Sequence, residues 1–207
     1  LVEQEAGGIS SAMITNSIMK VYGIDQEQLH KDAIENSPKI LPAKVMSVGS
    51  MLLNSLEKDG EDVDVNIRSA LEGESSSMLT IVTNEVGIEG AATLFYPELM
   101  EKLSDQFGDY FILPSSIHET LILPDDGFMS VTMLKNMVTE INETQVMENE
   151  RLTNEVYHYD SKEHVFERAD KFEERQKEKE AQLGKNEHMG KEQNMKQPKT
   201  KKHEMEL

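Results

Sequence analysis

The first of two stretches that carry side chains suited to chemistry holds Ser115, Ser116, His118 and Glu119. A serine hydrolase needs a hydroxyl nucleophile, a base within hydrogen-bond reach and an acid that orients the base. Residues 117–123 read as a β-strand, and neighbouring side chains of a strand point to opposite faces, so His118 and Glu119 would not meet in one site. The G-x-S-x-G motif of a nucleophile elbow is also missing. We interpret the stretch as a turn with a partly buried histidine and keep a hydrolase that uses His118 with Ser115 or Ser116 as the alternative.

The second stretch holds His158, Asp160 and His164. Alternate residues of a strand share a face, so His158 and Asp160 would point the same way, and a hairpin could return His164 toward them. Imidazole and carboxylate groups are ligands for zinc and other divalent metals. Because no further ligand is evident, we expect these side chains to lie at a hairpin rim and keep a metal site as the alternative.

Several chemistries are excluded or disfavoured by composition. The chain has no cysteine, which excludes a disulfide scaffold, a cysteine-ligated zinc site and a thiol nucleophile, and agrees with a cytoplasmic location. It has no glycine-rich strand-to-helix turn of the kind that holds a phosphate, and no cofactor is implied. No apolar run approaches the roughly 18 residues that a membrane-spanning helix needs, so we expect no membrane association.

Charge divides the chain into two parts. The 207 residues carry 39 acidic and 21 basic side chains, a net charge of −18. Residues 167–207 hold 10 acidic and 11 basic side chains, which leaves 29 and 10 for residues 1–166, a net charge of −19. Because phosphates would be repelled by such a surface, the acidic part is not expected to bind DNA or RNA.

Hydrophobic patterning predicts an α+β fold. Strands are expected at 78–83, 91–96, 110–113 and 117–123, the first two as a hairpin, with a closing hairpin at 156–159 and 164–166. Helices are expected at 47–56, from Pro97 to Gly108, and from Ser130 to Thr144. Because hairpins dominate, the sheet should be antiparallel or mixed, packed by several helices, and not doubly wound.

Four regions follow from these patterns. Residues 1–11 are expected to be a frayed N-terminal remnant, and residues 12–166 a single acidic domain. Within that domain, the acid-rich and serine-rich segment 57–77 reads as a mobile loop. The tail at 167–207 is expected to form a single helix to about residue 182 and then to be disordered, because its few apolar residues cannot offset the entropy of ordering.

Four strings within residues 12–166 carry a family resemblance: MITNSIMKVYGIDQEQLHKDAIENSPKILPAKVMS, VTNEVGIEGAATLFYPELMEKLSDQFGDYFILPSSIHETLILPDDG, VTEINETQV and VYHYD. The sequence resembles an uncharacterised bacterial domain-of-unknown-function family, frequent in gut anaerobes and often encoded near mobile elements. Members usually carry a further N-terminal portion, and neither residues 57–77 nor the tail belongs to the shared pattern. The resemblance implies a fold and no mechanism.

With no complete catalytic constellation in the sequence, we expect a non-enzymatic accessory or protein-interaction module. Its partner would be a protein that the sequence does not identify. A hydrolase that uses His118 is one alternative. The other is an acidic DNA mimic that occupies a basic site on another protein.

Overall fold

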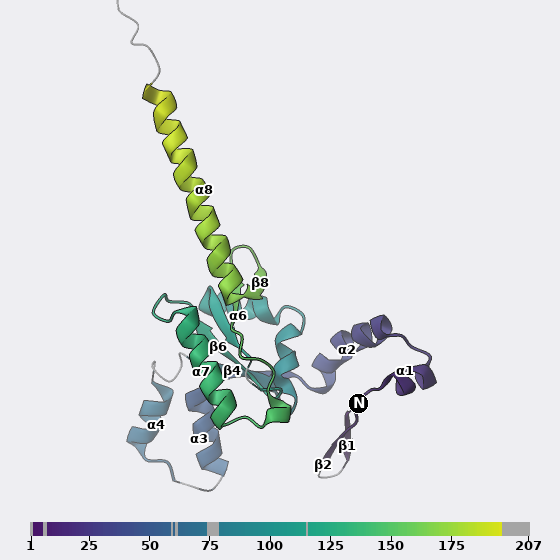
Figure 1. The fold of residues 1–207 in the computed structure, drawn as a ribbon. Coiled ribbons are helices and arrows are strands. Elements are labelled where there is room, and N and C mark those ends of the chain that lie inside the picture. Colours follow the sequence, from purple (N-terminus) through teal and green to yellow (C-terminus); the bar gives the residue numbers. More distant parts are fainter. Residues whose placement is uncertain are drawn as a thin grey trace, which may run out of the picture.

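A six-stranded antiparallel sheet lies at the centre of the body (Figure 1). Its strands follow the order β3-β4-β6-β5-β7-β8. The computed structural model describes residues 2–5, 8–58, 60, 62–73, 79–114 and 116–195. The strands are β3 (Ala43–Ser47), β4 (Thr80–Asn84), β5 (Tyr110–Leu113), β6 (Thr120–Pro124), β7 (Tyr157–Asp160) and β8 (Val165–Arg168). With helices on both faces of the sheet, the predicted α+β class is confirmed.

Successive side chains of β5 point to opposite faces of the sheet and pack into two separate hydrophobic cores. Phe111 and Leu113 pack under α7 (Val131–Thr144) and the start of α8 (Ala169–Met195). Tyr110 and Ile112 point to the other face, where η1 (Gly90–Phe95) and α6 (Leu99–Phe107) lie. Since β5 is central in the sheet, its four buried residues join both layers.

Helix α7 forms where it was predicted, and its sequence shows why. The Ser130 hydroxyl accepts a hydrogen bond from the Met133 amide (3.3 Å) and so caps the first turn. Val131, Leu134, Val138 and Asn142 are buried at spacings of three and four residues, which places them on one face.

The predicted strand at 91–96 is wrong, because the chain there forms the 3₁₀ helix η1. Gly90 lies so close to β4 that a Cβ would stand 2.2 Å from Thr83 Oγ1 and 2.6 Å from the carbonyl oxygen of His118. The amides of Gly90 and Ala91 donate to the carbonyls of His118 and Ile117, at 3.0 and 3.1 Å. The Thr93 hydroxyl then donates back to Gly90 O (2.7 Å), which closes the turn. The chain thus curls across the sheet instead of pairing along it.

The predicted loop at 57–77 contains helix α4 (Val65–Glu72), which packs beside α3 (Val48–Lys58). The Asp64 carboxylate caps α4 by accepting from the Asn66 amide (2.8 Å), and Arg68 pairs with Glu57 of α3 (2.6 Å). An N-cap and an ion pair therefore order a segment that looked too polar to fold. Positions 59, 61 and 74–78 lie outside the described residues.

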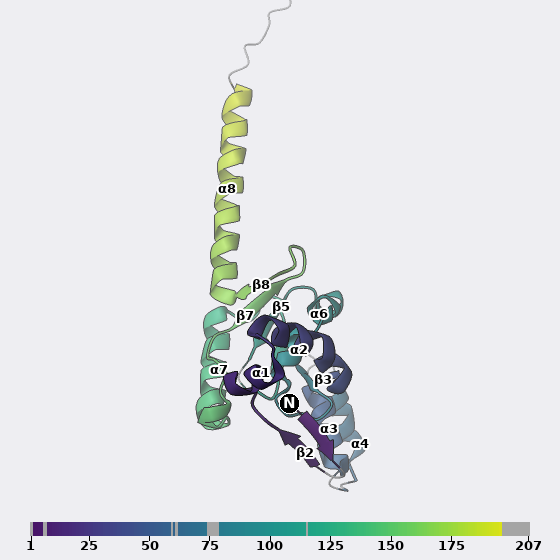
Figure 2. The same cartoon turned by 90° about the vertical axis from the view of Figure 1, so that its right-hand side faces the viewer.

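The N-terminal region, expected to be frayed over residues 1–11, contains two strands at residues 2–5 and 8–11. Strands β1 (Val2–Glu5) and β2 (Gly8–Ser11) pair as a hairpin, followed by α1 (Asn16–Tyr22) and α2 (Gln26–Ile40). Neither helix has a buried residue, and Figure 1 shows them to the right of the sheet, so that they face the viewer in Figure 2. The connection to β3 is held by the Tyr96 hydroxyl, which donates to Leu41 O (3.0 Å).

Helix α8 runs to Met195, beyond the end predicted near residue 182, and projects from the body (Figure 1). Its first turns contact β7 and β8, so the helix is anchored by packing at its start. Residues 196–207 lie outside the described residues. No helix of the described ranges is long and apolar enough to cross a membrane.

Candidate functional site

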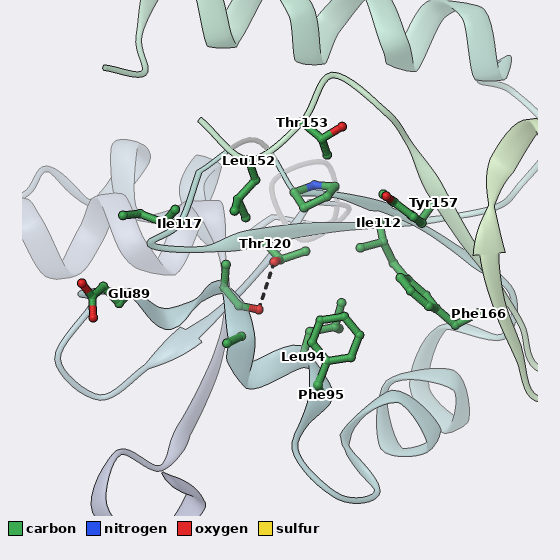
Figure 3. Close-up of a pocket in the computed structure, with 13 residues that line it drawn as sticks. Glu89, Leu94, Phe95, Ile112, Ile117, Thr120, Leu152, Thr153, Tyr157 and Phe166 are labelled. Atoms are coloured by element: carbon green, nitrogen blue, oxygen red, sulfur yellow. Dashed lines mark hydrogen bonds between the residues drawn. The ribbon is translucent and has the colours of Figure 1, made fainter. Parts of the chain in front are cut away.

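An apolar cavity of about 590 Å³ opens beside η1 and is called the η1 pocket below (Figure 3). It lies on the face of the sheet that η1 and α6 cover. Its lining comes from η1 and the residue before it, from β5 to β8, and from the segments that flank these strands: Glu89, Ala91, Ala92, Leu94, Phe95, Ile112, Pro114, Ile117, Thr120, Leu152, Thr153, Tyr157 and Phe166.

The pocket exists because η1 and α6 leave part of this sheet face uncovered. Ile112 of β5 and Tyr157 of β7 are direct cross-strand partners at its base. The Phe166 ring stacks on Tyr157 (5.1 Å between ring centroids) and meets Phe95 edge to face (5.7 Å). Phe95 is 53% exposed and Leu152 is 48% exposed, which is high for large apolar side chains. Phe95, Tyr157 and Phe166 thus form an aromatic wall of the pocket, and Phe95 and Leu152 lie at its solvent-exposed opening.

His118 lies beside this pocket, but its ring is not directed at any serine hydroxyl of the described residues. Its Nδ1 accepts from the Glu89 amide (3.1 Å), and its Nε2 lies 3.4 Å from a carboxylate oxygen of Glu150. The Ser116 hydroxyl instead accepts from the backbone amide of His118 (3.0 Å), as in an ordinary turn. Ser115 lies outside the described residues.

The predicted orientation of Glu119 depended on a strand at 117–123, and β6 begins only at Thr120. Glu119 lines a different cavity, together with Lys44 of β3 and Asn84 of β4. Ser116, His118 and Glu119 therefore do not converge as a nucleophile, its base and an orienting acid.

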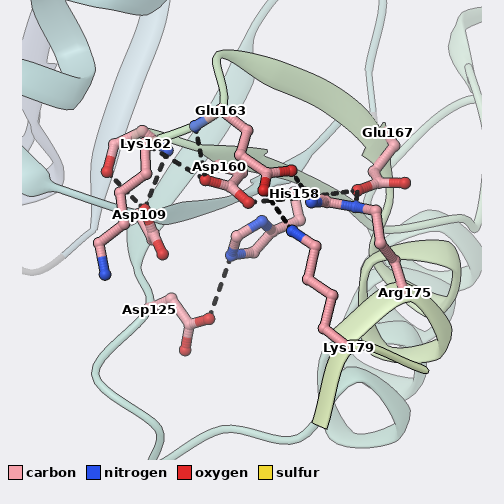
Figure 4. A network of polar contacts seen from close by, with 10 residues as sticks. Asp109, Asp125, His158, Asp160, Lys162, Glu163, Glu167, Arg175 and Lys179 are labelled. Atoms are coloured by element: carbon pink, nitrogen blue, oxygen red, sulfur yellow. Dashed lines mark hydrogen bonds and ion pairs between the residues drawn. The ribbon is translucent and has the colours of Figure 1, made fainter. Parts of the chain in front are cut away.

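His158 is fully buried on the opposite face of the sheet (Figure 4). Its ring stacks on Phe172 of α8 (3.6 Å) and meets Phe111 of β5 edge to face (5.2 Å). Its Nε2 lies 3.1 Å from the Asp125 carboxylate, so that nitrogen carries the proton of the neutral ring. Its Nδ1 is buried and has no hydrogen-bond partner among the described residues. Burial lowers the pKa of His158, although Asp125 opposes this shift.

Asp160 shares the strand with His158 and is held by its own hairpin and by α8. The amides of Lys162 and Glu163 donate to one carboxylate oxygen (both 3.0 Å), and Arg175 pairs with the other (3.0 Å). Burial alone would raise the pKa of Asp160, but the Glu163 amide and Arg175 outweigh it and lower the pKa. Asp160 is therefore an ion-pair partner of Arg175.

His164 does not join these two residues. It has a left-handed backbone (φ 54°), and its Nδ1 lies 3.3 Å from the Tyr159 hydroxyl, whose ring belongs to the other core. Among the described residues, no group of three or more histidine and acidic side chains is arranged to hold a metal ion.

The sequence patterns did not reveal the η1 pocket or the role of Arg175. The pocket combines side chains from 89 to 166, so no local spacing marks it. Arg175 lies in a segment whose charges balance, which looked like a solvated helix. The one available signal was Phe172, an aromatic residue within an otherwise polar run.

Comparison with known proteins places this domain in a family. One family model, described as a family of unknown function (DUF5688), matches residues 1–161. Searches of curated proteins and of solved structures found no match. The matched region ends directly after β7, so β8 and α8 lie beyond it. The chain therefore belongs to the DUF5688 family, and the expected membership of an uncharacterised family is confirmed.

Proposed function

We propose that this protein is a non-enzymatic accessory protein of the cytoplasm whose α+β domain binds a protein partner through the η1 pocket. The observation that carries the proposal is the pocket itself, an apolar cavity with Phe95 and Leu152 exposed at its mouth. Its volume of about 590 Å³ can take a large apolar side chain with part of its backbone. Aromatic and aliphatic anchors seated in such pockets carry much of the energy of protein recognition.

Charge indicates the chemistry of the partner. Glu89 lines the pocket, and the Glu150 side chain beside it remains 29% exposed. The first 166 residues carry a net charge of −19. A partner segment with a lysine or arginine next to its apolar anchor would be attracted to this surface, and nucleic acid would be repelled.

The two other hypotheses receive less support. A hydrolase would need the His118 ring to face a hydroxyl, and its nitrogens face Glu89 and Glu150 instead. A DNA mimic would need a row of free carboxylates on one face, and Asp160, Glu163 and Glu167 cannot contribute to such a row because they are paired with Arg175. We retain the interaction module.

Replacing Leu152 with serine is expected to weaken partner binding at least tenfold, about 1.4 kcal/mol, because the pocket loses apolar contact area. Leu152 is 48% exposed, so the fold should tolerate the change. The partner would be captured from native lysate, purified, and titrated by calorimetry. Phe128→Ser is the matched control, since Phe128 is 85% exposed and outside the pocket lining. Equal affinities for wild type and Leu152→Ser would contradict the proposal.

A further inference from the structure

Helix α8 is fastened to the body by two polar clusters that flank Phe172. The first joins the start of α8 to α7 and to the segment before β7. Lys135 pairs with Glu155 (2.6 Å), Arg168 pairs with Glu155 (3.0 Å), and Arg168 also pairs with Asp170 (2.6 Å). The second, called the Arg175 cluster, holds Asp160, Glu163, Glu167, Arg175 and Lys179 (Figure 4).

The Arg175 cluster connects α8 to the β7–β8 hairpin through ion pairs. The Arg175 guanidinium contacts Asp160 (3.0 Å), Glu167 (2.6 Å) and Glu163, and Lys179 adds a second contact to Glu163. The Asp160 side chain is only 5% exposed and that of Arg175 is 23% exposed, so this pair is shielded from solvent. Without Arg175, three carboxylates would face one another, with Lys179 in contact with Glu163 alone.

Phe172 closes the space over His158. The His158 and Phe172 rings stack with their centroids 3.6 Å apart. The Arg175 guanidinium carbon lies over the Phe172 ring, 5.5 Å from its centroid. The charged groups that act on His158 are Asp125 and Asp109, which lie side by side at the open end of the β5–β6 hairpin, and Asp160 on its own strand. Asp125 contacts only Nε2, which leaves Nδ1 buried without an acceptor among the described residues.

A second proton on the ring would have to go to Nδ1. It would create a buried N–H donor with no partner, which costs free energy until water reaches it. Phe172 of α8 covers the His158 ring. Unlike the strands, α8 is not held in place by sheet hydrogen bonds, so it can move without disrupting the sheet. Moving Phe172 away would let water reach Nδ1 while the hydrogen bonds of the sheet stay intact.

We propose that α8 is an acid-sensitive latch, docked over neutral His158 and released from the body as a unit when His158 takes up a proton. Release would free the projecting helix to change direction while the sheet and α7 remain folded. The latch lies directly beyond the region that the family model matches, and the inference does not depend on the η1 pocket.

The direction of the pH dependence follows from the two shifted groups. The pKa of His158 is lowered from the ordinary 6.5, so docking is fully stable above that value and weakens as pH falls below it. The pKa of Asp160 is also lowered, from 3.8, so its ion pair with Arg175 is lost only at more acidic pH. Both groups act in the same direction, and His158 acts first.

Because the chain has no cysteine, spin labels can be placed at will. With Glu140→Cys on α7 and Gln182→Cys on α8, both exposed, pulsed electron resonance should give one narrow distance distribution at pH 8 and a broader one as the pH falls below 6.5. His158→Phe should move the midpoint of broadening down by about one pH unit or more. His164→Gln, the matched control, should leave the midpoint unchanged.

Two results would overturn the latch. One is a distribution that stays narrow until tyrosine fluorescence reports global unfolding. The other is a midpoint that His158→Phe does not move. If His158→Phe is already broad at pH 8, the wild-type ring is followed by NMR instead. Its titration must then coincide with the broadening, and a titration without broadening would contradict the proposal.

Discussion

Replacing Gly90 with alanine is expected to lower the free energy of unfolding by about 3 kcal/mol or more, as the most severe overpacking substitutions do. A Cβ at this position would lie 2.6 Å from His118 O and 2.7 Å from the Asn84 amide nitrogen. Both are backbone atoms, and Gly90 itself donates to His118 O (3.0 Å), so relief would break the contact that holds η1. Urea denaturation followed by circular dichroism would measure the change.

Gly73→Ala provides the control for this prediction. An added Cβ there would meet its nearest atoms at 3.3 and 3.4 Å, which small adjustments can accommodate. Gly90→Ala should therefore be much the more destabilising of the two, and it should also weaken partner binding, because η1 forms a wall of the pocket. Similar unfolding free energies for the two variants would show that η1 does not depend on this close approach.

Replacing Arg175 with methionine is expected to undock α8 and to destabilise its contact with the body by about 2 kcal/mol. Removing one partner of a fully buried pair costs roughly 3–5 kcal/mol, and this pair is partly exposed. Methionine keeps an unbranched apolar side chain next to Phe172, so the change in stability reports the loss of the guanidinium alone. Amide hydrogen exchange should accelerate over the first three turns of α8 and stay unchanged in α7.

Lys177→Met is the matched control, because among the described residues Lys177 is paired with Glu173 at 3.7 Å and both side chains are largely exposed, at 75% and 44%. Such surface pairs contribute little to stability, so exchange in the first turns of α8 should not change. Equal acceleration of exchange in both variants would contradict the prediction. It would mean that the overall charge of α8, and not the specific contacts of the Arg175 cluster, keeps the helix docked.

Local signals in the sequence were sufficient for elements whose packing repeats along the chain. Helix α7 was predicted from Ser130 and from apolar residues at helical spacing, and β5 from four consecutive apolar residues. The segment 91–96 has the composition of a strand, yet it forms η1. The cause is the close approach of Gly90 to Thr83 and His118, a tertiary contact that local composition does not reveal. In the same way, α4 depends on a cap and on a pair with Glu57, 11 residues before Arg68.

The candidate site could be predicted far less well. Ser116 and His118 are close in sequence and suggested catalysis, but in the fold the Ser116 hydroxyl accepts from the His118 amide. His158 was recognised as unusual for its possible metal chemistry, whereas its surroundings are set by Phe172 and Asp125, 14 residues after and 33 before it. Burial and long-range pairing decide what such groups do, and neither can be read from spacing.

Methyl NMR of the chain with a bound peptide tests the central claim most directly. A peptide would be selected from a random display library on the wild-type protein, and it should carry a large apolar residue beside lysine or arginine. On titration, methyl signals of Leu94, Ile112 and Leu152 in the η1 pocket should shift, and those of Leu134 and Val138 on the buried face of α7 should not. Shifts confined to Leu134 and Val138, with the pocket signals unchanged, would contradict the account.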